Sequence, residues 1–272
     1  MTRWSWRWAV VTALIVGAVL FPLYWAIVSS FTPESRLFTA PKLIPAQLIL
    51  DHYRALFTTR DFWTPIRNSL IVAGATTALA ISLGAVCAYA LARLQFPGKS
   101  LTLAFVLAVA MFPQVSIVSP LYLILRKVGL LDTYPGLVLP YLTFAMPLTI
   151  WMLVGYFRQL PFELEEAAAL DGAGRLRTLW EVVLPLSAPG IATASILTFL
   201  YSWNEFLFAL SFALGPESYT VPVAIALFRG QYQVPWGEIL AGAVVATGPV
   251  ALIVLVAQRR IVAGLTAGAV KG

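Results

Sequence analysis

A series of long apolar segments, almost free of charge, most constrains the fold of this chain. A helix needs roughly 20 apolar residues to cross the hydrocarbon core of a bilayer. Backbone groups cannot stay unpaired in lipid, and the ten-residue alternation of a membrane β-barrel is missing, so the segments are predicted to be helices. We expect an all-α integral membrane protein, with residues 1–272 forming one transmembrane domain. Its six predicted spans cover residues 8–29, 69–92, 101–125, 137–156, 188–214 and 239–257.

Composition excludes a soluble globule and argues against nucleic acid as a partner. The chain is 60% hydrophobic and 11% charged, whereas soluble domains carry about 25% charged residues. The surplus apolar surface must therefore face lipid. The net charge is +6, but the Lys and Arg residues flank apolar runs and form no single stripe with interleaved aromatics.

An even number of spans places both termini on one side. Arg3, Arg7, Arg259 and Arg260 beside the terminal spans predict that this side is the cytoplasm.

The sequence offers no candidate for catalysis or metal binding. Cys87 is the only cysteine and His52 the only histidine, which excludes an internal disulfide and paired Cys or His ligands. The segment 98–100, Gly-Lys-Ser, resembles the end of a phosphate-binding P-loop, but Arg93 stands where that motif needs glycine. No nucleophile elbow occurs either. We predict no catalytic residue, no metal site and no cofactor held by this chain itself.

Prolines and small residues suggest how the spans pack. Each proline removes a helical hydrogen bond and favours a kink, although prolines are also commoner in membrane helices than in soluble ones. They are Pro113 and Pro120 in the third span, Pro140 and Pro147 in the fourth, and Pro189 at the start of the fifth. A four-residue repeat of small side chains in the second span predicts a face for close helix contact. Its members are Thr76, Ala80, Gly84, Ala88 and Ala92.

The segment 160–185 is the one loop with dense charge, and its apolar residues are patterned. They recur at helical offsets on either side of a turn: Leu164, Ala167 and Ala168 before it, and Leu176, Leu179, Trp180 and Val183 after it. Asp171 and Gly172 favour the turn, and Pro185 can stop the second helix. We predict two short amphipathic helices, which either dock on a partner protein or lie along the membrane surface.

The same segment carries a family motif. Residues 166–172 read Glu-Ala-Ala-Ala-Leu-Asp-Gly, and residues 182–185 read Val-Val-Leu-Pro. This string resembles the EAA loop of permease subunits in bacterial binding-protein-dependent ABC importers: Glu-Ala-Ala, three residues, Gly, nine residues, Ile-x-Leu-Pro. The spacing matches throughout, and Val182 for Ile is a conservative departure. Residues 203–206, Trp-Asn-Glu-Phe, and the terminal run 258–272 resemble the carbohydrate branch, in particular the shorter permease of maltose- and trehalose-type systems.

The resemblance implies a type I ABC importer permease fold in a bacterial inner membrane, with both termini cytoplasmic. It also implies the partners: a second homologous permease, a dimer of cytoplasmic ATPase subunits that bind ATP and Mg, and an extracytoplasmic solute-binding protein. The cargo would be a sugar, a disaccharide such as trehalose or maltose. The loop would be the coupling helix that docks on an ATPase subunit. The coupling residues it implies are Glu166, Ala167, Ala168, Asp171 and Gly172.

Two further sets of residues are candidates for contacts with sugar or binding protein. Glu205 is the single acidic residue inside a span, and such groups line a pathway or pair within a bundle. Together with Asn204 it either contacts sugar hydroxyls or gates the pore, or it forms a structural polar pair. In related sugar permeases the loop before the last helix reaches into the binding protein. Here that loop contains Gln231, Tyr232 and Gln233.

Other functional classes remain as alternatives. An autonomous secondary transporter or channel should show internal repeats or an ion-binding cluster, and the sequence has neither. An integral membrane enzyme should show a nucleophile–base pair or a metal cluster. The tail 258–272 either lies against the ATPase dimer, as the resemblance suggests, and serves regulation, or is a frayed terminus.

Overall fold

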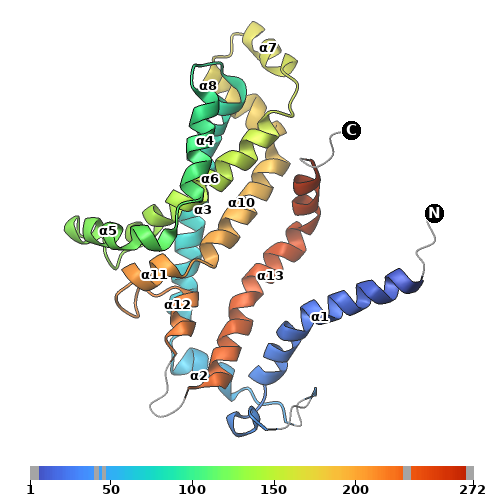
Figure 1. The fold of residues 1–272 in the computed structure, drawn as a ribbon, viewed down its shortest axis with the longest axis vertical. Helices are drawn as coiled ribbons and strands as arrows, with labels where there is room; N and C mark the ends of the chain where they lie inside the picture. Colours follow the sequence, from blue (N-terminus) through green and yellow to red (C-terminus); the bar gives the residue numbers. More distant parts are fainter. Residues whose placement is uncertain (1–5, 40–42, 45–46, 229–233, 268–272) are drawn as a thin grey trace. The chain divides into compact units, whose positions relative to one another are not determined.

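The computed structural model describes residues 6–39, 43–44, 47–228 and 234–267, with side chains described at all of these except Arg7 and residues 259–267. Every regular element within these ranges is helical, which confirms the predicted all-α fold (Figure 1). The chain forms two compact units. The first comprises Met1–Trp63 with Ala224–Pro249, and the second comprises Thr64–Val223 with Val250–Gly272.

The first unit holds the N-terminal helix and fixes the start of the last helix. Its elements are α1 (Trp6–Ser30), the short 3-10 helix η1 (Glu34–Arg36), α2 (Asp51–Thr58) and the first part of α13 (Trp236–Ala267). The Glu34 carboxylate accepts hydrogen bonds from the backbone N–H groups of Trp236 and Gly237, at 3.0 and 2.9 Å. Arg60 pairs with Glu238 at 2.7 Å. The two bonds to Glu34 satisfy N–H groups in the first turn of α13 that have no partner inside the helix.

The second unit is a bundle around α6, which is largely buried. Its elements are α3 (Trp63–Arg93), α4 (Lys99–Ala110), α5 (Gln114–Lys127), α6 (Tyr134–Phe157), α7 (Glu163–Leu170), α8 (Arg175–Thr178), the π-helical turn η2 (Leu179–Val183), α9 (Leu184–Leu186), α10 (Ala188–Trp203) and α11 (Leu207–Phe212). The short α12 (Val221–Ala226) and the long α13 belong partly to each unit. Helices α4 and α10 both pack against α6.

The long helices agree with four of the predicted spans, and the other two spans are interrupted. Single helices long and apolar enough to cross a membrane cover Trp8–Ser30, Trp63–Arg93, Tyr134–Phe157 and Trp236–Gln258. The predicted third span bends by 89° between α4 and α5. The helical segment 175–186 and α10 meet at an angle of 82°. The structure therefore has six crossings only if each of the two bent helix pairs is one span.

The interruption of the third span has a local cause. Pro113 precedes α5 in an extended conformation, with ψ 117, and its ring nitrogen has no hydrogen to continue the helix from α4. The predicted fifth span ends as α10 at Trp203 and resumes as α11 at Leu207. Pro140 and Pro147 instead lie inside α6, which stays continuous. A proline alone therefore does not decide where a span bends.

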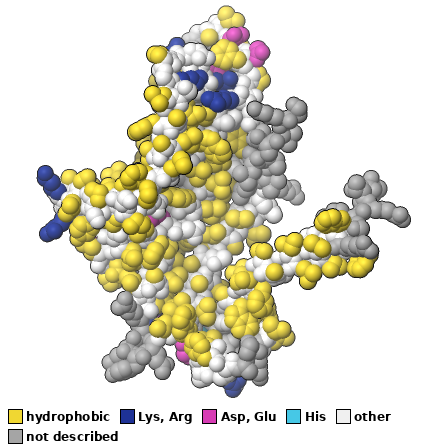
Figure 2. Space-filling model, in the orientation of Figure 1, with side chains coloured by type: hydrophobic (Ala, Val, Ile, Leu, Met, Phe, Trp, Pro, Cys, Tyr) yellow, Lys and Arg dark blue, Asp and Glu magenta, His cyan; other side chains and the backbone are white. Residues whose placement is uncertain are grey.

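Much apolar surface remains uncovered. Leu101, Phe105 and Val115 are each exposed over at least 70% of their surface. Figure 2 shows hydrophobic side chains over the flanks of the helices, and Lys and Arg side chains gathered at the end of the second unit that carries α7 and α8. A surface of this kind needs lipid or another subunit to cover it.

Small residues of α3 allow its close approach to α6. Thr76, Ala80, Gly84 and Ala88 are buried, as the four-residue repeat predicts. A Cβ atom on Gly84 would lie 3.0 Å from Thr149 Cγ2 of α6, which is closer than ordinary contact.

We expect the substitution Gly84→Val to destabilise the bundle, because overpacking typically costs about 1–3 kcal/mol. Gly74 on the same helix is the matched control, since a Cβ atom there would meet nothing within 4 Å. Thermal unfolding of the purified chain in detergent should show a lower midpoint for Gly84→Val and an unchanged midpoint for Gly74→Val. Equal midpoints for the two variants would contradict the close contact.

Candidate functional site

The segment between α6 and α10 folds as two helical pieces joined by a tight turn. Helix α7 ends at Leu170, and Gly172 follows in the left-handed region with φ +81. The N–H of Ala173 donates to the carbonyl of Ala168 at 2.9 Å, and the N–H of Gly172 donates to Ala169 at 3.0 Å. This pair of bonds is a Schellman motif, in which glycine tolerates the left-handed position without steric cost. The turn lies where the sequence predicts it.

The second helical piece continues past the residue expected to stop it. The helix runs from α8 through the π-helical turn η2 and α9 to Leu186, so Pro185 lies inside it and the bend comes at Ser187. The prediction that Pro185 ends this helix is therefore wrong by two residues. A proline ring clashes with the carbonyl four residues before it, and the wider π turn over Leu179–Val183 gives that carbonyl more room.

A buried ion pair fastens α7 to the end of α3. Arg93 Nε lies 2.8 Å from Glu165 Oε1, and both side chains are about nine-tenths buried, with 7% and 11% exposed. The Tyr89 hydroxyl donates to the other Glu165 oxygen at 3.0 Å. Arg93 also donates to the Leu160 carbonyl at 2.7 Å and lies over the Phe162 ring. The last turn of α3 thus contacts both Leu160 in the connection from α6 and Glu165 in α7.

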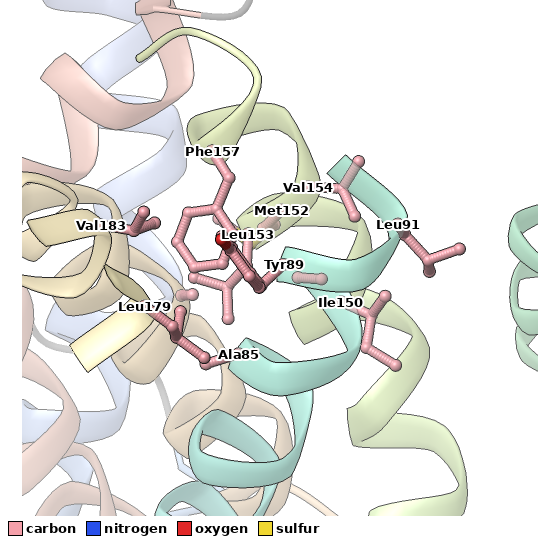
Figure 3. Packing of buried hydrophobic residues seen from close by; sticks show 12 residues of the cluster. Ala85, Tyr89, Leu91, Ile150, Met152, Leu153, Val154, Phe157, Leu179 and Val183 are labelled. Carbon is pink, nitrogen blue, oxygen red and sulfur yellow. The ribbon is translucent and has the colours of Figure 1, made fainter. Parts of the chain in front are cut away.

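An apolar contact fastens the second piece. Leu179 and Val183 of η2 are fully buried within the main hydrophobic cluster of the bundle. Figure 3 shows them directed toward Phe157 and Leu153 of α6 and toward Tyr89 of α3. The ion pair and this cluster share Tyr89, so the whole segment is attached to α3 and α6 at two points.

The opposite side of the segment is uncovered. Leu170 is 90% exposed, Leu176 66% and Trp180 59%. Of the apolar residues predicted to share one face of the second helix, Leu179 and Val183 pack into the bundle. The other two, Leu176 and Trp180, lie on the uncovered side. Figure 1 places α7 at the extremity of the second unit. The motif residues Glu166, Ala167, Asp171 and Gly172 are exposed, and Ala168 is half-buried.

The structure places Asn204 and Glu205 at the break between α10 and α11. Glu205 is 7% exposed, and its two carboxylate oxygens accept the N–H groups of Phe208 and Ala209 at 2.9 and 3.1 Å. Asn204 is exposed and donates to the Leu200 carbonyl at 2.7 Å. Both oxygens of Glu205 therefore hold the start of α11, which favours the structural interpretation of this pair. A role in the sugar pathway stays a prediction.

Two other predicted regions are only partly described. Gln231, Tyr232 and Gln233 lie outside the described residues. The tail from Gln258 continues α13 as a helix to Ala267, and its remaining residues lie outside the description.

Sequence reasoning missed a polar network that ties α3 to the segment between α11 and α12. Asn68 is fully buried and donates to the carbonyls of Glu217 and Tyr219 at 2.7 and 3.0 Å. It also accepts the Tyr134 hydroxyl at 2.8 Å. The signal in the sequence that could have indicated this network is Asn68 itself, a polar residue in the first turns of a long apolar helix.

Asp132, in the connection before α6, completes the support of the same segment. Its carboxylate accepts the N–H groups of Leu214 and Gly215 at 2.7 and 3.2 Å and the Ser218 hydroxyl. Partial burial raises the pKa of Asp132, but these three donors favour the carboxylate and bring the pKa below its ordinary value. The stabilisation is present above the unfolded pKa and is lost as the pH falls through the folded pKa.

Comparison with known proteins agrees with this geometry. Residues 64–266 match the family described as "Binding-protein-dependent transport system inner membrane component". The chain belongs to this family of permease subunits and is a multi-pass membrane protein. The family range begins at the second residue of α3 and covers the ion pair, the turn and the break at Glu205.

Individual relatives and a solved structure are similar over nearly the whole chain. The trehalose transport system permease protein SugB of Mycobacterium tuberculosis (strain CDC 1551 / Oshkosh) is 48% identical over 97% of both chains. The trehalose/maltose transport system permease protein MalG of Thermococcus litoralis is 41% identical over 95% of this chain and 96% of its own. A chain of a bacterial ABC transporter that imports alginate shares the fold, with TM-score 0.78 and 22% identity over 95% of this chain and 98% of its own.

The ion pair of α7 gives a direct test of how the segment is attached. The substitution Glu165→Gln leaves the Arg93 charge buried without its partner, which typically costs about 3–5 kcal/mol. Amide hydrogen exchange across α7 should then become much faster. The matched control is Glu181→Gln, because Glu181 pairs with Arg177 at the exposed surface of the same segment, at 2.8 Å. Exposed pairs contribute about 0–1 kcal/mol, so exchange should barely change. Similar exchange in both variants would contradict the attachment.

Proposed function

We propose that this chain forms half of the translocation pathway of an ATP-driven sugar importer and passes motion from ATPase subunits to the membrane helices. The observation that carries the proposal is the segment 163–186: it is fixed to α3 and α6 on one side and presents uncovered apolar residues on the other. A segment built this way can dock on a partner and move the helices to which it is attached. The chain itself performs no chemistry.

The proposed assembly follows the family. The chain pairs with a second homologous permease, and a dimer of cytoplasmic ATPase subunits binds ATP and Mg and receives α7. An extracytoplasmic solute-binding protein delivers the sugar, and residues 231–233 contact it. Both termini and the segment 163–186 lie in the cytoplasm of a bacterial cell, because Lys and Arg flank the terminal spans. In a solved alginate transporter the complex includes a pentasaccharide-bound periplasmic protein.

The proposed cargo is a disaccharide such as trehalose or maltose. This rests on the similarity to SugB and MalG, whose names specify trehalose and maltose. The coupling residues proposed are Glu166, Ala167, Ala168, Asp171 and Gly172, which lie on or beside the uncovered face of α7. An autonomous secondary transporter or channel is not favoured, because the relatives of this chain are permeases of binding-protein-dependent systems.

The proposed mechanism is alternating access. ATP can drive the cycle only if its binding favours one conformation of the assembly over the other. Closure of the ATPase dimer displaces α7, and the ion pair and apolar cluster carry that displacement to α3 and α6. The bend at Pro113 and the break at Asn204 divide the membrane region into short helices that can shift separately.

The turn at Gly172 provides the test. In the substitution Gly172→Val the left-handed φ of +81 costs about 1–2 kcal/mol and disturbs the Schellman turn. The matched control is Gly174→Val, because Gly174 has an ordinary φ of −74 and a Cβ atom there meets nothing within 4 Å. Both variants should insert normally into the membrane. In the assembled transporter, Gly172→Val should lose most sugar uptake while ATP hydrolysis continues, and Gly174→Val should transport normally.

Unchanged uptake by Gly172→Val would count against the coupling role of the turn. Purification of an active, ion-driven chain without any ATPase subunit would instead overturn the importer assignment as a whole.

A further inference from the structure

A groove lies between the α3–α4 connection, the first turns of α4 and the end of α6. It has a volume of about 650 Å³ and lies entirely within the second unit. Its polar end is formed by Gly98, Lys99, Ser100 and Arg158. Its other lining residues are the apolar Phe96, Leu103, Ala104 and Leu107. None of the described residues that line it is acidic.

The two cations at the polar end are held in different ways. The Lys99 ammonium donates to the carbonyls of Leu94 and Ala92 at 2.9 and 3.4 Å, which fixes it beside the end of α3. Arg158 is exposed, and its guanidinium has no ion-pair partner in the part of the chain that the structure describes. Arg93 at the same end is already neutralised by Glu165. Lys99 and Arg158 therefore leave an excess of positive charge at the groove.

The apolar wall continues from this charged end along one side of α4. Leu103 and Leu107 lie four and eight residues after Lys99, which corresponds to about 6 and 12 Å along the helix. A small soluble anion would gain nothing from such a wall. A molecule with a charged head and an apolar tail would use both parts of the groove.

We infer that this groove binds an acidic phospholipid. Its phosphoryl group lies between Lys99 and Arg158, and an acyl chain lies against Leu103 and Leu107. Basic pockets between membrane helices bind acidic lipid head groups in this manner. The Gly-Lys-Ser string at 98–100, which cannot complete a P-loop, thereby gains a role beside a phosphoryl group without any nucleotide.

The position of the groove links lipid binding to the segment 163–186. Arg158 directly follows Phe157, which is fully buried against Leu179 in the apolar cluster. Lys99 donates to the carbonyls of Ala92 and Leu94, on either side of Arg93 at the end of α3. A bound lipid would therefore stabilise the two helix ends to which α7 is attached.

The test counts lipids on the full-length chain, purified in mild detergent together with the subunits that remain bound to it. Native mass spectrometry would compare phosphatidylglycerol with phosphatidylcholine of the same acyl chains. Wild type should retain more phosphatidylglycerol. One basic residue near an acidic lipid surface contributes about 1 kcal/mol, or about a fivefold change in affinity, so Arg158→Gln should weaken retention about fivefold. Arg158→Lys should preserve it.

Arg126→Gln is the matched control, since Arg126 is another exposed arginine that lies outside the groove. It should retain phosphatidylglycerol as wild type does. Equal retention of the two lipids by wild type, or full retention by Arg158→Gln, would overturn the inference. Retention of inorganic phosphate by a wild-type chain that holds no phosphatidylglycerol would overturn the lipid assignment in favour of a free anion. A companion subunit that covers the groove would give no retained lipid in wild type, which also contradicts the proposal.

Discussion

The ion pair between Arg93 and Glu165 is the contact on which the arrangement of the segment between α6 and α10 depends. Two charges that are about nine-tenths buried cost free energy to desolvate, and the cost is offset only when their geometry and remaining hydrogen bonds are good. Tyr89 and the Leu160 carbonyl supply those hydrogen bonds. A shift of α7 that kept only one of the two side chains buried would leave its charge without a partner. The pair therefore favours the observed position of α7 on α3.

The rest of the segment follows from that position. With α7 fixed, the Schellman turn at Gly172 directs the second helical piece back to the bundle, where Leu179 and Val183 enter the apolar cluster. The same geometry leaves Leu170, Leu176 and Trp180 uncovered. A surface that is apolar, exposed and rigidly attached suits the docking of a partner subunit, as the proposed function requires. In that proposal, docking and the transmission of motion both depend on this one folded segment.

The sequence predicts the apolar helices and the turn well, because length, hydropathy and glycine chemistry are local properties. It does not predict the break at Asn204 or which prolines bend a span. Hydropathy carries no information on backbone continuity, and Pro140 and Pro147 lie inside α6 without ending it. It also misses the partner of Glu165, since Arg93 is distant in the chain. Tyr89 and Arg93, four residues apart at the end of a span, were the available signal. The helical period could not tell which apolar residues of 176–183 face inward, because a partner surface and the bundle core attract the same residue types.

The central claim is that α7 and the end of α3 move as one body during the transport cycle. Spin labels at Glu163→Cys on α7 and Gln95→Cys after α3, in a Cys87→Ala background, would report this directly, since both positions are exposed and neither belongs to the proposed docking surface. The distance between them should be measured in the assembled transporter without nucleotide and with ATP trapped. The account predicts one unchanged distance in both states. A nucleotide-dependent shift of that distance by several ångströms would contradict it.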